Sequence, residues 1–220
     1  MKVANVKDGD VVLDFFSGSA ATAHAVMKLN SEGNGKRKFI LIQLPEKCGE
    51  KTEAYRLGYE TICQIGEERI RRAAKKIKEE TGADIDYGFR VFSVDTTNRK
   101  EVYYSPAEYS QELLFMLESS VKPDRTDLDL LFGCLLDWGL PLSLPYHSDI
   151  IEGCTVHNYN AGDLIACFDE NIPESVMKEI ARQKPLRVVF RDHSFSGSAS
   201  KINVGELFKR MAPDTAVKVI

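Results

Sequence analysis

The pattern near the start of the chain constrains its fold most. Residues 11–16 form an apolar run, broken only by Asp14, that stops at the small residues 17–19. Such a run is typical of a strand covered on both faces, as in a parallel sheet. A helical pattern over 20–29 follows, and a second apolar run occupies 39–42 after a glycine-rich break. Strand, turn, helix and strand in this order predict a right-handed βαβ unit.

The rest of the first half predicts a long helix and one further strand. Apolar residues recur every three to four positions over 59–80, which indicates an amphipathic helix. The segment 88–94 has the pattern of a strand. The polar segment 95–107 carries Pro106 and is typical of a domain connection, so we expect a first domain over residues 1–100.

The second half, residues 101–220, has the alternating pattern of a separate α/β domain. Its sequence predicts helices over 106–119, 127–138, 173–183 and 204–211, and strands over 154–159, 164–168, 186–190 and 216–220. The expected fold class is therefore α/β. It combines a partial Rossmann-like unit, built on a parallel sheet, with a smaller C-terminal α/β domain.

The composition excludes several protein classes. The chain has 220 residues, of which 43% are hydrophobic and 28% charged, so it can bury a core without disulfides or metals. It has neither a run of about 18 apolar residues nor a signal region, so we expect no membrane span and a cytoplasmic location. Its five cysteines contain no CxxC pair, which favours reduced thiols and predicts no metal site.

Charge is divided unevenly between the halves. Residues 1–100 carry 18 Lys and Arg against 15 Asp and Glu, whereas residues 101–220 carry 11 against 18. The first half is therefore the one expected to meet a polyanion. Its main basic run, at 69–78, predicts either a solvated helix face paired with nearby glutamates, which we favour, or contact with DNA phosphates.

The turn at 17–19 is the strongest candidate for chemistry. Small residues at the carboxyl end of a parallel strand let a ligand approach the backbone, and the helix that follows offers unpaired N–H groups. Asp14 can accept hydrogen bonds from an ammonium group or a ribose hydroxyl. With one glycine the turn is no dinucleotide fingerprint, and the chain has no P-loop. On these residues alone, a nucleoside cofactor site and a turn of closely packed small residues both remain open.

These residues resemble a known family. The stretch Asp14-Phe15-Phe16-Ser17-Gly18-Ser19, followed by Ala-Ala-Thr-Ala-His-Ala-Val, is similar to motif I, the cofactor-binding motif of S-adenosylmethionine-dependent DNA amino-methyltransferases. The resemblance is closer to the modification subunits of type III restriction-modification systems. It extends through the blocks at 36–40, 43–46, 58–73, 184–192 and 201–204.

The resemblance implies a site-specific DNA adenine-N6 methyltransferase. It also implies double-stranded DNA as a substrate of the full-length protein, a homodimer of modification subunits, and a restriction subunit as partner. The residues implied for the S-adenosylmethionine site are Asp14, Phe16, Gly18, Ser19 and Gln43. The chain departs from the family at Ala20 and Ala21, where Gly and Thr are common, and Gln43 stands where many methyltransferases carry a carboxylate.

The catalytic DPPY-type tetrapeptide of this family does not occur in the 220 residues. In this class it precedes motif I, so the resemblance predicts the C-terminal part of a longer enzyme, with no catalytic residue and no activity alone. The alternative is a non-catalytic assembly module, with contacts through the acidic second half and its leucine stripes at 113–117 and 130–136. A small-molecule methyltransferase would need an acceptor site, and the sequence shows none.

The histidines predict structure rather than chemistry. His24 is expected to pack within the first helix, because methyl transfer from a sulfonium needs no general base there. His147, His157 and His193 lack the spacing of zinc ligands.

Overall fold

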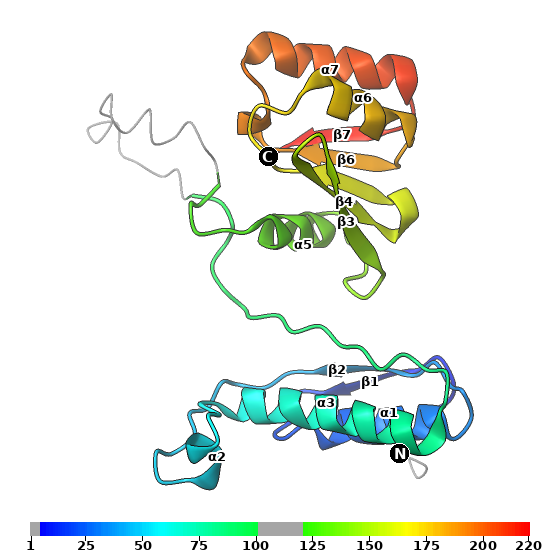
Figure 1. The fold of residues 1–220 in the computed structure, drawn as a ribbon, viewed down its shortest axis with the longest axis vertical. Coiled ribbons are helices and arrows are strands. Elements are labelled where there is room, and N and C mark those ends of the chain that lie inside the picture. Colours follow the sequence, from blue (N-terminus) through cyan, green and yellow to red (C-terminus); the bar gives the residue numbers. More distant parts are fainter. Residues whose placement is uncertain (1–4, 101–120) are drawn as a thin grey trace. The chain divides into compact units, whose positions relative to one another are not determined.

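The structure, a computed structural model, describes residues 5–100 and 121–220. The chain divides into two compact units, Met1–Val91 and Phe92–Ile220 (Figure 1). Each unit combines helices with strands, so the predicted mixed α/β class is confirmed. None of the helices in the described ranges has the length and apolar character that a bilayer crossing requires.

The first unit is built around two parallel strands joined through a helix, which confirms the predicted βαβ order. Its elements, in chain order, are β1 (Val11–Asp14), α1 (Ala21–Ser31), β2 (Lys38–Leu41), α2 (Glu53–Arg56) and α3 (Ile62–Thr81).

Local sequence sets both ends of α3. The Thr61 hydroxyl accepts a hydrogen bond from the Gln64 backbone N–H, and the Gln64 side chain accepts one from the Thr61 N–H, which makes a capping box. Gly82 ends the helix in the left-handed conformation at φ 59°. The helix begins three residues later than its apolar periodicity predicts, because the cap defines the first turn.

One side of the β1–β2 sheet packs on α1 and α3, which both lie on that side of the strands (Figure 1). Apolar residues of the other side, such as Leu13 and Ile40, are more than half exposed. The expectation that both faces are covered is therefore wrong for the described residues. The buried cluster under Phe39 and Leu41 of β2 consists of Ala20, Ala23, Met27, Ile70 and Ile77.

The strand predicted over 88–94 does not form. Phe89 packs against the core of the first unit, and the Tyr87 hydroxyl donates to the Ala83 carbonyl at 2.8 Å. Val91 and Val94 are exposed. An apolar alternation is not sufficient for a strand, because the backbone also needs a neighbouring edge to pair with.

The second unit holds a five-stranded sheet in the order β3-β4-β5-β6-β7. The pairs β3–β4 and β4–β5 are antiparallel, and β5–β6 and β6–β7 are parallel. The elements are α5 (Asp127–Asp137), β3 (Tyr146–Ile151), β4 (Cys154–Tyr159), β5 (Leu164–Cys167), α6 (Glu174–Arg182), β6 (Arg187–Phe190), α7 (Ser198–Met211) and β7 (Ala216–Val219).

Two elements of the second unit differ from prediction. β3 is an unpredicted edge strand; its middle residues are exposed, so it lacks an apolar alternation. α7 begins at Ser198, six residues before its predicted start, because its first turns are polar. The helix predicted over 106–119 lies outside the described residues.

Helices cover this sheet on both sides (Figure 1). Along β5, Ile165 and Cys167 belong to the core under α6 and α7, and the alternate residues Leu164 and Ala166 belong to the core under α5. Because side chains alternate along a strand, the two clusters lie on opposite faces.

Candidate cofactor site

The residues predicted for the cofactor site gather at the carboxyl ends of β1 and β2. Asp14 is the last residue of β1. Its Oδ2 accepts a hydrogen bond from Thr22 Oγ1 at 2.5 Å, and its Oδ1 accepts one from the Phe16 backbone N–H at 3.3 Å. These bonds hold the carboxylate between the turn and the start of α1. Phe16 is 79% exposed, so its ring is accessible to a ligand.

Gln43 joins the end of β2 to the glycine turn. Its Oε1 accepts a hydrogen bond from the Gly18 N–H at 2.7 Å, and its Nε2 donates to the Leu44 carbonyl at 3.2 Å. A primary amide has two acceptor lone pairs and two donor hydrogens, so Gln43 keeps one of each for a ligand. The structure thus gives Gln43 a role in shaping the turn that the sequence does not predict.

The turn adopts the left-handed conformation at two residues, Gly18 at φ 52° and Ala20 at φ 59°. Glycine reaches this region freely, whereas alanine there costs about 1–2 kcal/mol. The Ala20 methyl is buried against α3, and a Cβ at Gly66 would lie 3.4 Å from it. Alanine in place of the family's glycine therefore strains the turn but fills its contact with α3.

The helix start beside the turn is open to a ligand. The N-cap residue of α1 is Ala20, whose methyl group cannot accept a hydrogen bond, and the first turn of α1 contains no acidic residue. The free N–H groups favour a negatively charged ligand group. Nothing lies within 4 Å of where Gly18 would carry a Cβ. An exposed ring, a carboxylate and free backbone donors fit the adenosine, ammonium and carboxylate groups of S-adenosylmethionine.

A hollow of about 450 Å³ lies next to this turn, lined by residues of α1 and α3. Ser19 lines it and accepts a hydrogen bond from Arg69 Nη1 at 2.8 Å. Burial lowers the pKa of His24, and the charge of Arg69 lowers it further, so both favour the neutral imidazole. Arg72 and Lys76 also line it, together with Glu68, and both cations are paired with glutamates of α3. The sequence does not predict Arg69 as a neighbour of Ser19, because 50 positions separate them.

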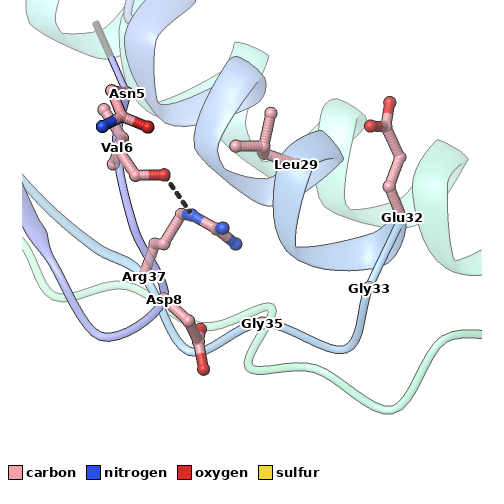
Figure 2. A pocket seen from close by; sticks show the side chains of 8 residues that line it. All are labelled: Asn5, Val6, Asp8, Leu29, Glu32, Gly33, Gly35 and Arg37. Carbon is pink, nitrogen blue, oxygen red and sulfur yellow. Dashed lines mark hydrogen bonds between the residues drawn. The ribbon is translucent and has the colours of Figure 1, made fainter. Parts of the chain in front are cut away.

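A second hollow, of about 460 Å³, lies before the amino ends of β1 and β2 (Figure 2). Arg37 Nε donates to the Val6 carbonyl at 3.3 Å, and Asp8 accepts from the Lys36 N–H at 2.6 Å. These hydrogen bonds connect the segment before β1 to the segment before β2. Open parallel sheets bind ligands at the carboxyl ends of their strands, which favours the turn at 17–20 over this hollow as the candidate site.

Ion pairs occupy much of the basic run on α3. The two partners of each pair lie one helical turn apart on the helix surface, so each pair contributes little to stability. This pairing agrees with the favoured interpretation of a solvated helix face. The pairs are Arg71–Glu67 at 2.8 Å, Arg72–Glu68 at 2.7 Å, Lys76–Glu80 at 3.7 Å and Lys75–Glu79 at 3.9 Å.

His157 forms a polar cluster that the sequence does not predict. Its Nδ1 lies 2.7 Å from Ser148 Oγ, and its Nε2 lies 3.6 Å from an Asp127 carboxylate oxygen. In a nucleophilic triad the serine contacts Nε2 and the acid contacts Nδ1, so the ring here is reversed. We interpret the buried His157 as a link between β4 and the first residue of α5.

Cys154, Cys167 and Asp169 form a second unexpected cluster, with candidate ligand atoms within 4.8 Å of one another. Both thiols belong to the apolar core, and burial raises the pKa of Cys167 to about 12. Asp169 already accepts a hydrogen bond from the Thr155 N–H at 2.6 Å. Metals bind the thiolate, and a raised pKa keeps the thiol protonated. We therefore interpret this cluster as core packing.

Of the two leucine stripes predicted as possible assembly contacts, the structure describes only the second. Residues 113–117 lie outside the described residues. Leu130, Leu131 and Leu135 are buried in the core of their own unit, and Leu136 is exposed. Most of the described stripe is therefore core.

Comparison with known proteins identifies the relatives of the chain. No protein-family model matches it. It is 46% identical over 101 residues to the Mod subunit of the type III restriction-modification enzyme StyLTI of Salmonella typhimurium LT2, which covers 46% of this chain and 15% of the relative. The EcoP15I Mod subunit of Escherichia coli is 28% identical over 96% of this chain, and the EcoPI Mod subunit of Escherichia phage P1 is 29% identical over 100% of it.

The chain is much shorter than these relatives. It spans 32% of the EcoP15I Mod subunit and 34% of the EcoPI Mod subunit, about a third of each. Three separate Mod subunits match, and two of them match over nearly the whole chain. The homologues of this chain are therefore the Mod subunits of type III restriction-modification enzymes.

Proposed function

We propose that this chain is part of a site-specific DNA adenine-N6 methyltransferase and holds its S-adenosylmethionine. The turn at 17–20 carries the proposal. Its backbone N–H groups and the side chains of Asp14 and Gln43 meet at the carboxyl ends of two parallel strands, the place where open α/β sheets bind ligands. Homology to Mod subunits supports methylation of DNA as the activity of the whole enzyme.

Three residues of the site and the start of α1 have defined tasks in this proposal. Asp14 accepts hydrogen bonds from the ammonium group of the cofactor. The N–H groups at the start of α1 bind the carboxylate group of the cofactor. Phe16 packs on the adenosine, and Gln43 binds a ribose hydroxyl through its remaining donor or acceptor. The cofactor supplies a methyl group on a positively charged sulfur. The chain has no DPPY-type tetrapeptide to hold the target amine, so we propose that it transfers no methyl group alone.

The remaining partners follow from the same homology. We propose that the full-length protein binds double-stranded DNA, forms a homodimer of modification subunits and joins a restriction subunit in the cytoplasm. The names of the relatives support the restriction-modification context.

Titration calorimetry with S-adenosylhomocysteine tests the cofactor site. The 220-residue chain should give saturable heat, and Gly18→Val should abolish it, because a branched side chain is strained at φ 52° and fills the approach to the turn. Gly82→Val is the matched control, since it introduces the same strain at φ 59° outside the site and should leave the heat unchanged. Folded chain that gives no heat up to millimolar concentrations would refute the proposal.

A second candidate function is that of an assembly module. One observation favours it, namely the exposed apolar side of the β1–β2 sheet. Assembly and cofactor binding do not exclude each other, because they use different faces of the first unit.

A further inference from the structure

Arg69 differs from the other cations that line the hollow beside the turn. Arg72 is paired with Glu68 at 2.7 Å, and Lys76 is paired with Glu80 at 3.7 Å, so glutamates of α3 compensate both charges. In the part of the chain that the structure describes, Arg69 forms no ion pair. Its positive charge therefore stays uncompensated in this hollow.

The Arg69 charge lies directly against the turn. Its Nη1 donates a hydrogen bond of 2.8 Å to Ser19 Oγ, and Ser19 lies between Gly18 and Ala20, the two left-handed residues of the turn. The hydroxyl is neutral, so it orients the guanidinium without cancelling the charge. A guanidinium has five N–H donors, and this hydrogen bond uses one of them. Arg69 therefore keeps both its charge and further donors for a ligand bound at the turn.

Packing fixes the place of Arg69 relative to the turn. A Cβ added at Gly66 would lie 3.4 Å from the Ala20 methyl and 3.4 Å from the Gly18 carbonyl oxygen, so α3 lies close against the turn there. Residues three apart lie on the same side of a helix, and Arg69 follows Gly66 by three positions. The contact at Gly66 therefore holds Arg69 beside Ser19.

The field of this charge extends to α1. Burial is the main cause of the lowered pKa of His24, the fourth residue of α1, and the Arg69 charge is the next. A charge that disfavours a second cation at this helix favours an anion there. The first turn of α1 contains no acidic residue that would oppose the Arg69 charge.

We infer that Arg69 is a specificity-determining residue that makes the turn prefer ligands with a carboxylate group. The inference rests on the proposed function, because S-adenosylmethionine and S-adenosylhomocysteine carry this group at their amino-acid end. A guanidinium stabilises a bound carboxylate beyond what neutral N–H groups provide. The adenosine part is uncharged and gains nothing from it. Arg69 therefore selects the intact cofactor over nucleosides that lack the carboxylate.

Titration calorimetry with two ligands tests the inference. The ligands are S-adenosylhomocysteine and its decarboxylated form, which keeps the ammonium group and lacks only the carboxylate. Arg69→Ala should weaken binding of the first about tenfold and binding of the second less than about twofold, because the charge acts on the carboxylate alone. Arg71→Ala is the matched control. It removes the same charge from α3, at an exposed pair with Glu67, and should change neither affinity.

Two further variants separate the charge of Arg69 from its hydrogen bond to Ser19. Arg69→Lys keeps the charge and should keep most of the preference for the carboxylate. Arg69→Gln keeps a donor for the Ser19 hydroxyl without the charge, so it should lose the preference as Arg69→Ala does. Circular dichroism verifies that each variant folds.

The outcomes distinguish this inference from the proposed function. Equal losses of both ligands in Arg69→Ala would overturn the inference, because they would show that Arg69 only supports the turn. Unchanged binding in Arg69→Ala, or an equal loss in Arg71→Ala, would overturn it as well. In all three cases the unchanged chain still binds S-adenosylhomocysteine, so the proposed function stands. An unchanged chain that binds neither ligand would refute the proposed function and the inference together.

Discussion

The two sheets of this chain are covered to different extents. In the five-stranded sheet, helices of the same unit bury both faces, so alternate residues of β5 enter two separate cores. In the β1–β2 sheet, α1 and α3 bury one face and leave the other exposed. Since apolar burial is the main stabilising term in folding, the five-stranded sheet contributes more stability to its unit than the β1–β2 sheet contributes to the first unit.

The largest expected effect compares a core residue of the five-stranded sheet with an exposed apolar residue of the β1–β2 sheet. Phe190→Ala removes a fully buried ring of β6 and should lower the free energy of unfolding of the second unit by about 3–5 kcal/mol. Leu13→Ala, at a 57% exposed position of β1, should change that of the first unit by less than about 1 kcal/mol.

Denaturant titration measures both variants. Trp138 is the single tryptophan and packs against the core of the second unit, so its fluorescence reports that unit. Circular dichroism reports both units. Equal losses from Phe190→Ala and Leu13→Ala would remove the contrast between the two sheets.

A smaller effect is expected where α3 supports the cofactor turn. Gly66→Val should destabilise the first unit by about 1–3 kcal/mol, because its side chain would press on Ala20 and the Gly18 carbonyl, each 3.4 Å from an added Cβ. It should also weaken S-adenosylhomocysteine binding. Gly205→Val in α7, with nothing within 4 Å, should change stability by a few tenths of a kcal/mol. Thermal unfolding of both variants decides this, and a cost at Gly205 as large as at Gly66 would contradict it.

The helix caps should affect the two units alike. Thr61 caps α3 and Thr126 caps α5, each with a capping box. Thr61→Ala and Thr126→Ala should each cost about 1 kcal/mol in their own unit. Denaturant titration with the two probes described above measures each loss. Thr→Ser at the same positions serves as the control that keeps the cap, and an equal loss for serine would show that the hydroxyl is not what stabilises the helix.

The smallest effect is a pH dependence that only one cap should have. Hydrogen bonds from Thr126 lower the pKa of Asp129. The Asp129 carboxylate therefore stabilises α5 fully at pH values above the ordinary pKa of an aspartate. That stabilisation should be lost as the pH falls below about 4 and through the lowered pKa. Gln64 takes the same place in α3 and does not titrate. Asp129→Asn should remove the dependence in unfolding measured from pH 7 to 3, and an unchanged profile would contradict this assignment.

The sequence predicts what depends on neighbouring residues. The order strand, turn and helix around Asp14 and Gly18 follows from local pattern, and the structure confirms it. The exposed side of the β1–β2 sheet does not follow, because a continuous apolar run has the same appearance whether one or both faces of a sheet are covered. The predicted strand at 88–94 fails for a related reason, since strand pairing depends on a partner distant in sequence.

The site shows the same division. Resemblance places Gln43 near the cofactor, but its hydrogen bond to Gly18 spans 25 positions and appears only in the folded chain. The contact of Arg69 with Ser19 spans 50 positions. Whether Asp14, Phe16, Gly18, Ser19 and Gln43 bind the cofactor stays a prediction for calorimetry to decide.

The contact between Ala20 and Gly66 has a consequence for sequence change in this site. An added Cβ at Gly66 would lie 3.4 Å from the Ala20 methyl, which sits on a strained backbone. Ala20→Gly alone relieves the strain and leaves a small void, and Gly66→Ala alone places a second methyl group in contact with the first. Made together, the two substitutions remove the methyl group from position 20 of the turn and add one at position 66 of α3. A related chain can therefore acquire the family's glycine in the turn without losing its packing, provided that α3 changes with it.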